Sequence, residues 1–186
     1  MASQEYIAGI DIGSTAVRMA VGVLASAGDK ETINIVGLAE AQSLGTHRGV
    51  VNSIDDVVSS ISMCHERLER MVVAPIENVW VGIGGPQLLS QTSRGFISVA
   101  RSDGEIQDED VDRAVEAART VATPSNYEIL HAIPKSFTVD RQAGIKSPLG
   151  MTGVRLEVDA EIIQAPSAQI RNLTRAIYRT GLDIDD

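Results

Sequence analysis

Hydrophobic residues alternate with polar or small residues over most of the first 40 positions, with the period of two that a half-buried β-strand requires. The alternation predicts strands at roughly 6–12, 16–25 and 32–40. The intervening breaks, residues 13–15 and 26–31, are short. Short connections make consecutive strands antiparallel neighbours, so we expect a β-meander.

The hydrophobic period lengthens to three and four residues after residue 53, which predicts a helix. Ser53 fits the N-cap position, and Asp56 three residues later makes an acidic variant of the capping box. Pro75 should end the helix. The apolar stripe consists of Ile54, Val57, Val58, Ile61, Cys64 and Leu68.

Beyond the helix, a break at Gly84 and Gly85 indicates a boundary between two structural units. Around and after it lie strand-like segments at 79–83, 95–100, 127–140 and 154–162, with one helical stripe over 111–121. We expect residues 80–162 to form a small inserted domain, a sheet covered by one helix. Residues 1–79 and 163–186 then form one split unit around it.

Several details refine these elements. Pro134 interrupts its strand, which indicates an edge or a bulge. Residues 141–150 are rich in turn formers and are interpreted as a long loop. Strict alternation over 154–162 predicts a strand with one exposed face. The last helix should cover 167–180 and stop at Gly181.

An acidic stretch runs from Asp103 to Asp112 and allows two interpretations. It could bind a cation, but its spacing does not fit the calcium-loop pattern. It also directly precedes the helical stripe over 111–121, where acids stabilise a helix N-terminus. The second interpretation is favoured.

Composition narrows the class of protein. The 186 residues are 44% hydrophobic but only 3% aromatic, so the core must be aliphatic, as in an α/β protein. The net charge of −9 argues against a nucleic-acid partner. No early segment resembles a signal peptide, and no run of about 18 apolar residues could span a membrane. We therefore expect a cytosolic α/β protein.

Three side chains that often carry chemistry are interpreted as structural. Cys64 is the single cysteine, which excludes an internal disulfide and fits a reducing compartment. It lies on the apolar helix stripe, so it should be a buried thiol. His65 lies beside that stripe and His131 lies in a strand, and neither has a ligand partner nearby in the sequence.

The best functional candidate is the break between the first two strands. Asp11 comes just before the end of the first strand, and Gly13, Ser14 and Thr15 form the turn. Such a turn can aim backbone N–H groups and two hydroxyls at phosphate oxygens, while the Asp11 carboxylate holds a hydrated metal ion. The same residues also occur in hairpins where Gly and Ser only make the turn, so this alternative stays open.

Together, several stretches resemble the FtsA family of actin-like bacterial cell-division proteins, and the resemblance covers essentially the whole chain. The first stretch, the turn at 9–15, is shared more widely with actins, heat-shock ATPases and sugar kinases. The more specific ones lie around the predicted insertion. The stretches are Gly-Ile-Asp-Ile-Gly-Ser-Thr (9–15), Gly-Thr-His-Arg-Gly-Val-Val-Asn (45–52), Ile-Leu-His-Ala-Ile-Pro (129–134) and Gly-Ile-Lys-Ser-Pro-Leu-Gly-Met-Thr-Gly-Val-Arg (144–155).

The resemblance implies an α/β fold of the actin-like, RNase-H-like type. Residues 1–79 and 163–186 would be subdomain 1A, and residues 80–162 the inserted α+β subdomain 1C, of the SHS2 kind. It further implies that Gly13, Ser14 and Thr15 hold the phosphates of ATP and that Asp11 holds Mg²⁺ through water; it assigns no catalytic residue.

The family's role implies the partners. FtsA proteins tether FtsZ to the inner membrane at the division site, assemble into filaments, and recruit later division proteins, the last through the 1C subdomain. We therefore expect a cytoplasmic protein at the inner face of the cell membrane. The membrane would be reached only through a C-terminal helix that this chain does not include.

Two departures lower the expected activity of the chain itself. Ala16 stands where many family members carry Lys, which would add a charge-assisted contact to phosphate; Arg18, on the same face, could partly replace it. The chain also includes no second phosphate loop and no second lobe after Asp186. We expect it to bind nucleotide weakly or not at all, and any weak ATP hydrolysis to belong to the longer protein.

Two other functions remain as alternatives. One is an actin-like protein of pilus assembly, of the PilM type, which also carries a 1C-like insertion. The other is a sugar-kinase or heat-shock type ATPase, which would need a catalytic acid or base near the γ-phosphate. Asp11 is the only candidate for that role in this sequence.

Overall fold

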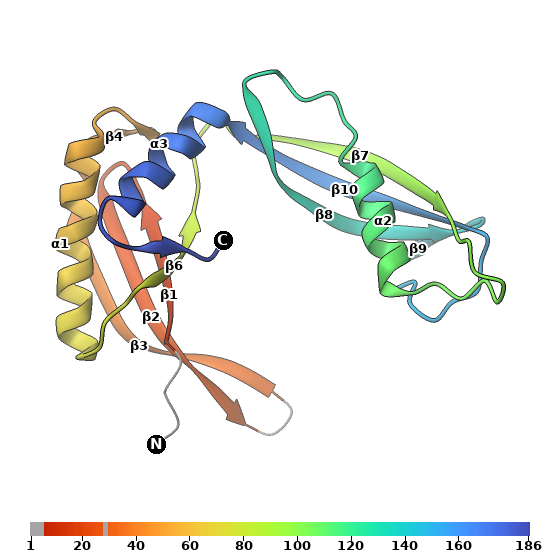
Figure 1. Cartoon of the computed structure of the whole chain (residues 1–186), viewed down its shortest axis with the longest axis horizontal. Helices are drawn as coiled ribbons and strands as arrows, with labels where there is room; N and C mark the ends of the chain where they lie inside the picture. Colours follow the sequence, from red (N-terminus) through yellow and green to blue (C-terminus); the bar gives the residue numbers. More distant parts are fainter. Residues whose placement is uncertain (1–5, 28–29) are drawn as a thin grey trace. The chain divides into compact units, whose positions relative to one another are not determined.

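The computed structural model describes residues 6–27 and 30–186, which divide into two compact units (Figure 1). Unit 1 consists of Met1–Pro86 and Ala168–Asp186, and unit 2 of Gln87–Ser167. Unit 2 is therefore an insertion in the sequence of unit 1. Residues 28–29, in the middle of the expected connection at 26–31, lie outside the described residues.

Unit 1 is built on a five-stranded sheet with the order β11-β6-β1-β2-β3. The first three strands are antiparallel neighbours, which confirms the predicted meander. β6 runs parallel to β1, and β11 parallel to β6. The bounds are β1 (Tyr6–Ile12), β2 (Ala16–Ala27), β3 (Lys30–Gln42), β6 (Asn78–Gly82) and β11 (Asp183–Ile184), and a separate short hairpin joins β4 (Thr46–His47) to β5 (Val50–Val51).

Helix α1 (Ile54–Val72) begins as its sequence predicts. The side chain of Ser53 accepts a hydrogen bond from the backbone N–H of Asp56 at 3.4 Å, so the N-cap is confirmed. The helix ends three residues before Pro75, where Val73 adopts a left-handed φ of 54° and donates its N–H to Glu69 O. The second helix of this unit is α3 (Ser167–Tyr178).

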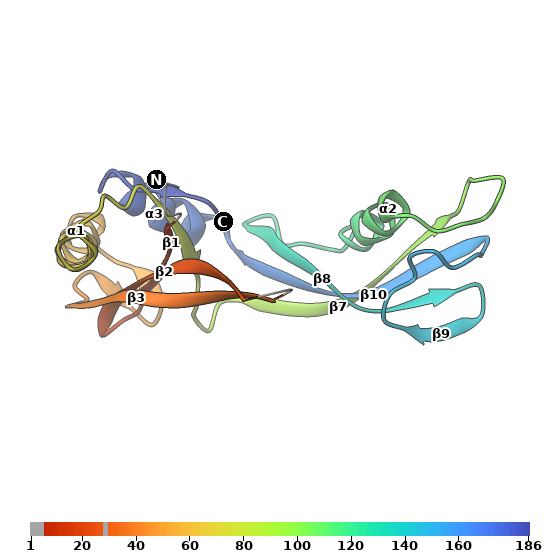
Figure 2. The ribbon, with the colours of Figure 1, turned by 90° about the horizontal axis from the view of Figure 1, so that it is seen from below.

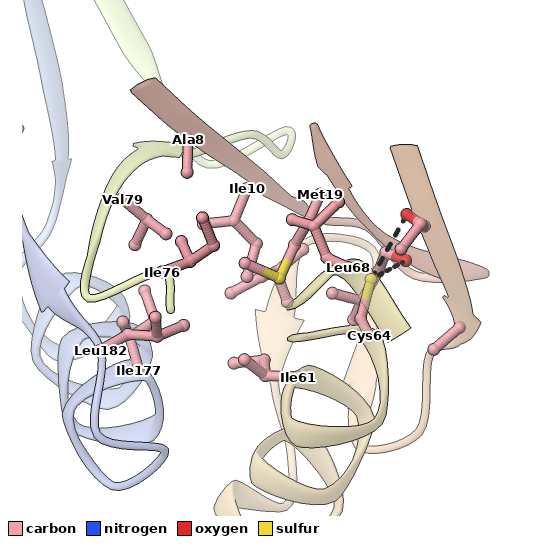
Figure 3. Packing of buried hydrophobic residues seen from close by; sticks show 14 of the residues in the cluster. Ala8, Ile10, Met19, Ile61, Cys64, Leu68, Ile76, Val79, Ile177 and Leu182 are labelled. Carbon is pink, nitrogen blue, oxygen red and sulfur yellow. Dashed lines mark hydrogen bonds between the residues drawn. The ribbon is translucent and has the colours of Figure 1, made fainter. Parts of the chain in front are cut away.

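Both helices cover the same face of the unit 1 sheet, and their apolar stripes form its core (Figure 3). Ile10 and Met19 from the sheet meet Leu68 from α1 and Ile177 from α3 in this cluster. Cys64 lies among them; its Sγ is 3.5 Å from Val17 O and 3.3 Å from Ala39 O. Cys64 is fully buried, which confirms the predicted buried thiol, and this burial raises the pKa of the thiol.

Unit 2 is a four-stranded sheet with α2 (Asp108–Ala118) along one face (Figures 1 and 2). The sheet order is β7 (Leu89–Ser98), β10 (Arg155–Pro166), β8 (Tyr127–Val139), β9 (Gln142–Ile145). The helix approaches β7 so closely that a Cβ at Gly95 would lie 2.2 Å from Ala114 O. Only glycine allows this contact.

Two details of unit 2 follow the sequence. Asp108, Glu109 and Asp110 occupy the first turn of α2, which confirms that the acidic stretch leads into a helix N-terminus. The pairing of β10 with β8 shifts register between Ser136 and Pro134, which confirms the bulge predicted at that proline.

Three predictions about elements are wrong. The strand predicted at 79–83 was expected to begin the insertion, but it is β6 (Asn78–Gly82), which pairs with β1 in unit 1. β7 begins at Leu89, whereas the sequence predicted a strand only from residue 95. The first half of β7 is exposed, so its sequence resembles that of a polar loop. The expected loop at 141–150 contains β9, which pairs with β8. The insertion consequently extends over Gln87–Ser167 instead of 80–162.

Within residues 6–27 and 30–186, no helix has the length and apolar character needed to cross a bilayer.

Candidate phosphate-binding site

The turn between β1 and β2 is a tight three-residue loop with unused hydrogen-bond donors. Gly13 N–H donates to Ala16 O at 3.1 Å and closes the loop, and Thr15 O accepts from Ser43 N–H at 3.0 Å. Within the described ranges, no hydrogen bond engages the backbone N–H of Ser14 or of Thr15. Both residues are exposed. Their amides and hydroxyls are therefore available to an oxyanion.

Asp11 lies beside this turn, on the sheet face opposite the buried core. Its side chain is 64% exposed, and its cross-strand partner is Arg18. Arg18 Nη1 is 3.9 Å from Asp11 Oδ2, while Arg18 Nε donates to Glu40 Oε2 at 2.8 Å. Arg18 therefore lies across from Asp11 on the neighbouring strand, and its guanidinium is held between the carboxylates of Asp11 and Glu40.

The strand ends that surround the turn favour a ligand there. β1 and β6 are parallel, and Asp11 is in register with Gly82, so both strands end at the same edge of the sheet. Ligands of α/β proteins bind at the carboxyl ends of parallel strands. Gly84, just beyond β6, lies in the loop that follows this edge.

Segments from the β4–β5 hairpin also reach the turn. Gly49 N–H donates to Ser14 Oγ at 3.1 Å, which leaves the hydroxyl proton of Ser14 free to donate elsewhere. Gly49 has a left-handed φ of 76°, and a Cβ there would lie 2.5 Å from Gly84 O. The turn, the hairpin and the loop after β6 thus converge although they are distant in sequence.

These residues fit the phosphate end of a magnesium nucleotide. Gly13 allows the loop to close tightly, since a Cβ on it would lie 3.0 Å from Ala16 O. Asp11 supplies one exposed carboxylate, which suits a magnesium ion that keeps most of its water ligands. In the part of the chain that the structure describes, no three His, Cys, Asp or Glu side chains are grouped as direct metal ligands.

Other candidate side chains lie elsewhere. His65 Nε2 is 2.9 Å from Ile76 O and 3.4 Å from Glu69 Oε1, so it is a hydrogen-bonded, half-buried histidine on α1. His131 is exposed on β8, in unit 2. Neither belongs to the turn.

Sequence reasoning missed one participant, Gln169 in the first turn of α3. It donates to Gly49 O and Gly84 O and is 5% exposed. The sequence gives no signal that Gln169 contacts this region, because its hydrogen-bond partners are backbone carbonyls 120 and 85 residues away.

Comparison with known proteins now shows what the chain resembles. Residues 85–164 match the model of the SHS2 domain inserted in FtsA. The chain is 36% identical to the cell division protein FtsA of Neisseria meningitidis, over 98% of this chain and 43% of that protein. It is 35% identical to FtsA of Bacillus subtilis, over 100% of this chain and 41% of that protein. The chain is thus similar to FtsA proteins over nearly all of its own length.

A solved structure of the PilM–PilN type IV pilus biogenesis complex is similar in fold. It matches 97% of this chain and 46% of its own, with a TM-score of 0.60 and 14% identity. At that identity the match supports the fold alone. The predicted actin-like α/β fold with an inserted SHS2-type domain is thereby confirmed. The chain spans about two fifths of the length of the curated FtsA relatives above.

Proposed function

We propose that this chain is part of an actin-like ATP-binding scaffold protein of bacterial cell division. Support comes from its similarity to curated FtsA proteins along nearly all of its length. By analogy with that family, the longer protein would link FtsZ to the inner membrane, at the cytoplasmic face of the division site. Unit 2 (Gln87–Ser167) would recruit later division proteins and contact other protomers in filaments.

The proposed nucleotide site is the turn at 11–15. The observation that carries it is the set of unengaged donors on Ser14 and Thr15, at the edge where parallel strands end. Gly13, Ser14 and Thr15 would hold phosphate oxygens, and Asp11 would hold Mg²⁺ through water. ATP supplies the phosphates, and Mg²⁺ offsets their negative charge. Weak hydrolysis would belong to the longer protein.

Because Ser14 and Thr15 are exposed, a phosphate bound to this chain would remain in contact with water on one side. We therefore expect a dissociation constant for Mg-ATP on the order of 1 mM rather than micromolar. Amide chemical-shift mapping of the chain during a Mg-ATP titration should perturb residues 13–15 first.

Two pairs of variants test the assignment. Ser14→Ala and Asp11→Asn should weaken the perturbation severalfold, the second mainly in the presence of Mg²⁺. Ser59→Ala on exposed α1 surface and Asp103→Asn in the loop before α2 should not. Perturbation that survives both site variants, or that lies away from residues 13–15, would reject this site.

The role in division needs a separate test. Depleting the protein that carries this chain in its host should give long, undivided cells. Re-expression of the protein should restore septation. Normal division during depletion would contradict the proposed function whatever the nucleotide result.

A further inference from the structure

Gln169 is a buried residue whose side chain makes two hydrogen bonds, and the proposed phosphate contacts do not account for them. The residue lies in the first turn of α3 and is 5% exposed. Its Nε2 donates to Gly49 O at 2.7 Å and to Gly84 O at 3.2 Å. One side-chain amide thus joins the β4–β5 hairpin to the loop after β6.

The chemistry of the two partners fixes the orientation of this amide. Both are carbonyl oxygens, which only accept hydrogen bonds, so the amide nitrogen must face them. The amide oxygen, Oε1, points away; it is buried and has no hydrogen-bond partner within the described residues. An unsatisfied buried acceptor costs free energy, so packing alone does not account for a glutamine at this position.

The contact extends to the phosphate turn. Gly49 receives the Gln169 amide on its carbonyl and gives its own N–H to Ser14 Oγ at 3.1 Å. A continuous path of hydrogen bonds therefore runs from Ser14 through Gly49 and Gln169 to Gly84. Close approach of Gly49 to Gly84 leaves no room for a side chain at Gly49.

The same path reaches both places where the chain joins the two units. Gly84 lies two residues before Pro86, where unit 1 is interrupted. Gln169 immediately follows Ala168, where unit 1 resumes. The outgoing and the returning connection of unit 2 are thus tied to each other and to the turn by one side chain.

We propose that Gln169 is a positioning residue that couples the phosphate turn to both connections of the inserted unit. A nucleotide phosphate hydrogen-bonded to the Ser14 hydroxyl would restrain Gly49. Through Gln169 it would also restrain the loop at Gly84 and the start of α3. This coupling rests on the proposed nucleotide site, whereas the positioning of Gly49 by Gln169 does not depend on nucleotide.

Two isosteric variants of the whole chain test the positioning. Gln169→Met keeps the volume but removes the donor, and Gln169→Glu replaces the donor by a carboxylate that faces two carbonyls. Both should speed amide hydrogen exchange at Gly49 about tenfold or more, because the hairpin loses its tether. Core amides of β1 and α1 should keep their exchange rates.

A pH series separates donation from packing. Protonating the introduced carboxyl of Gln169→Glu restores one donor, so acid should slow Gly49 exchange again relative to Gln169→Met at the same pH. The matched control is Gln164→Met, at a glutamine that is 1% exposed and donates to Thr123 in unit 2. It should leave Gly49 unchanged. Unchanged Gly49 exchange in both Gln169 variants, or equal acceleration throughout unit 1, would overturn the positioning role.

Mg-ATP then tests the coupling. In the unaltered chain, millimolar Mg-ATP should slow exchange at Gly84, Gly85 and the first turn of α3; in Gln169→Met this remote effect should vanish while shifts at residues 13–15 persist. A remote effect that survives in Gln169→Met would overturn the coupling. If Mg-ATP perturbs nothing in the unaltered chain, the nucleotide proposal and the coupling fail together, while the exchange result still decides the positioning of Gly49.

Discussion

Gly49, next to the proposed phosphate site, is a position where both the backbone conformation and the available space favour glycine. Its φ of 76° is left-handed, and a Cβ would lie 2.5 Å from Gly84 O, which is backbone and cannot move aside. We expect Gly49→Ala to lower the free energy of unfolding of unit 1 by about 3 kcal/mol or more. Chemical denaturation followed by a unit 1 core probe measures the loss.

Gly181 provides the control for this substitution. It has a similar left-handed φ of 84° in unit 1, but a Cβ there would have no neighbour within 4 Å. Gly181→Ala should therefore cost only the backbone strain, about 1–2 kcal/mol. Equal losses for the two substitutions would mean that the close approach of Gly49 to Gly84 is relieved at little cost.

At this scale the sequence predicts local chemistry better than long-range contacts. The turn at 11–15 could be recognised because its glycine, hydroxyls and acid are consecutive. Gln169 could not, since its two acceptors are backbone atoms that carry no sequence signal. The contacts of Arg18 with Asp11 and Glu40 could not be predicted either, because they depend on how β1 and β3 align with β2.

Among the elements, α2 depends on one buried acid at its N-terminus. Asp110 is 5% exposed and accepts from the backbone N–H of Gln107 at 3.1 Å. Asp110→Ala leaves that donor unpaired and removes a favourable charge from the helix start, so unit 2 should lose about 1–2 kcal/mol of stability. Asp112→Ala, two residues later and exposed, should change stability by less than about 0.5 kcal/mol.

The exposed face of β10 offers a test that depends on pH. Lys135 on β8 and Ser90 on β7 both contact the Glu161 carboxylate, and these contacts, that of Lys135 first, hold its pKa below the ordinary value. A lowered folded-state pKa stabilises unit 2 at pH values above the unfolded-state pKa. The contribution disappears as the pH falls through the folded-state pKa.

Lys135→Met should therefore raise the pKa of Glu161 toward its ordinary value and flatten the acid side of the stability profile of unit 2. Carboxyl carbon shifts of Glu161 during an NMR titration give the pKa directly. Lys146→Met, which removes a positive charge elsewhere in unit 2, is the control. An unchanged Glu161 titration in Lys135→Met would show that the cross-strand ion pair does not persist in solution.

The elements that the sequence predicted best are those with a single strong period. β1–β3 and α1 show clean alternation or a clean helical stripe, and their bounds lie within a few residues of expectation. β7 was half missed because Leu89–Arg94 is exposed along the strand. β6 was assigned to the wrong unit because a strand pattern specifies burial but not the neighbour that supplies it.

At the scale of the whole molecule, the insertion is organised so that its two ends meet. β7 and β10 are antiparallel neighbours, and Leu89 near the start of unit 2 is in register with Gln164 near its end. Unit 2 also has its own core, separate from that of unit 1. A domain with adjacent ends and an independent core can be inserted without disrupting its host.

Residues 87–167 expressed alone should therefore fold and unfold in one cooperative transition. Leu156 is fully buried in the unit 2 core, so Leu156→Ala should lower stability by about 2–5 kcal/mol. The loss should be the same in the isolated unit and in the whole chain, because the core residues around Leu156 all belong to unit 2. Ile61→Ala, in the core of unit 1, should leave the unit 2 transition of the whole chain unchanged. A broad, non-cooperative melt of residues 87–167 would contradict an autonomous insertion, as would a Leu156→Ala effect confined to the whole chain.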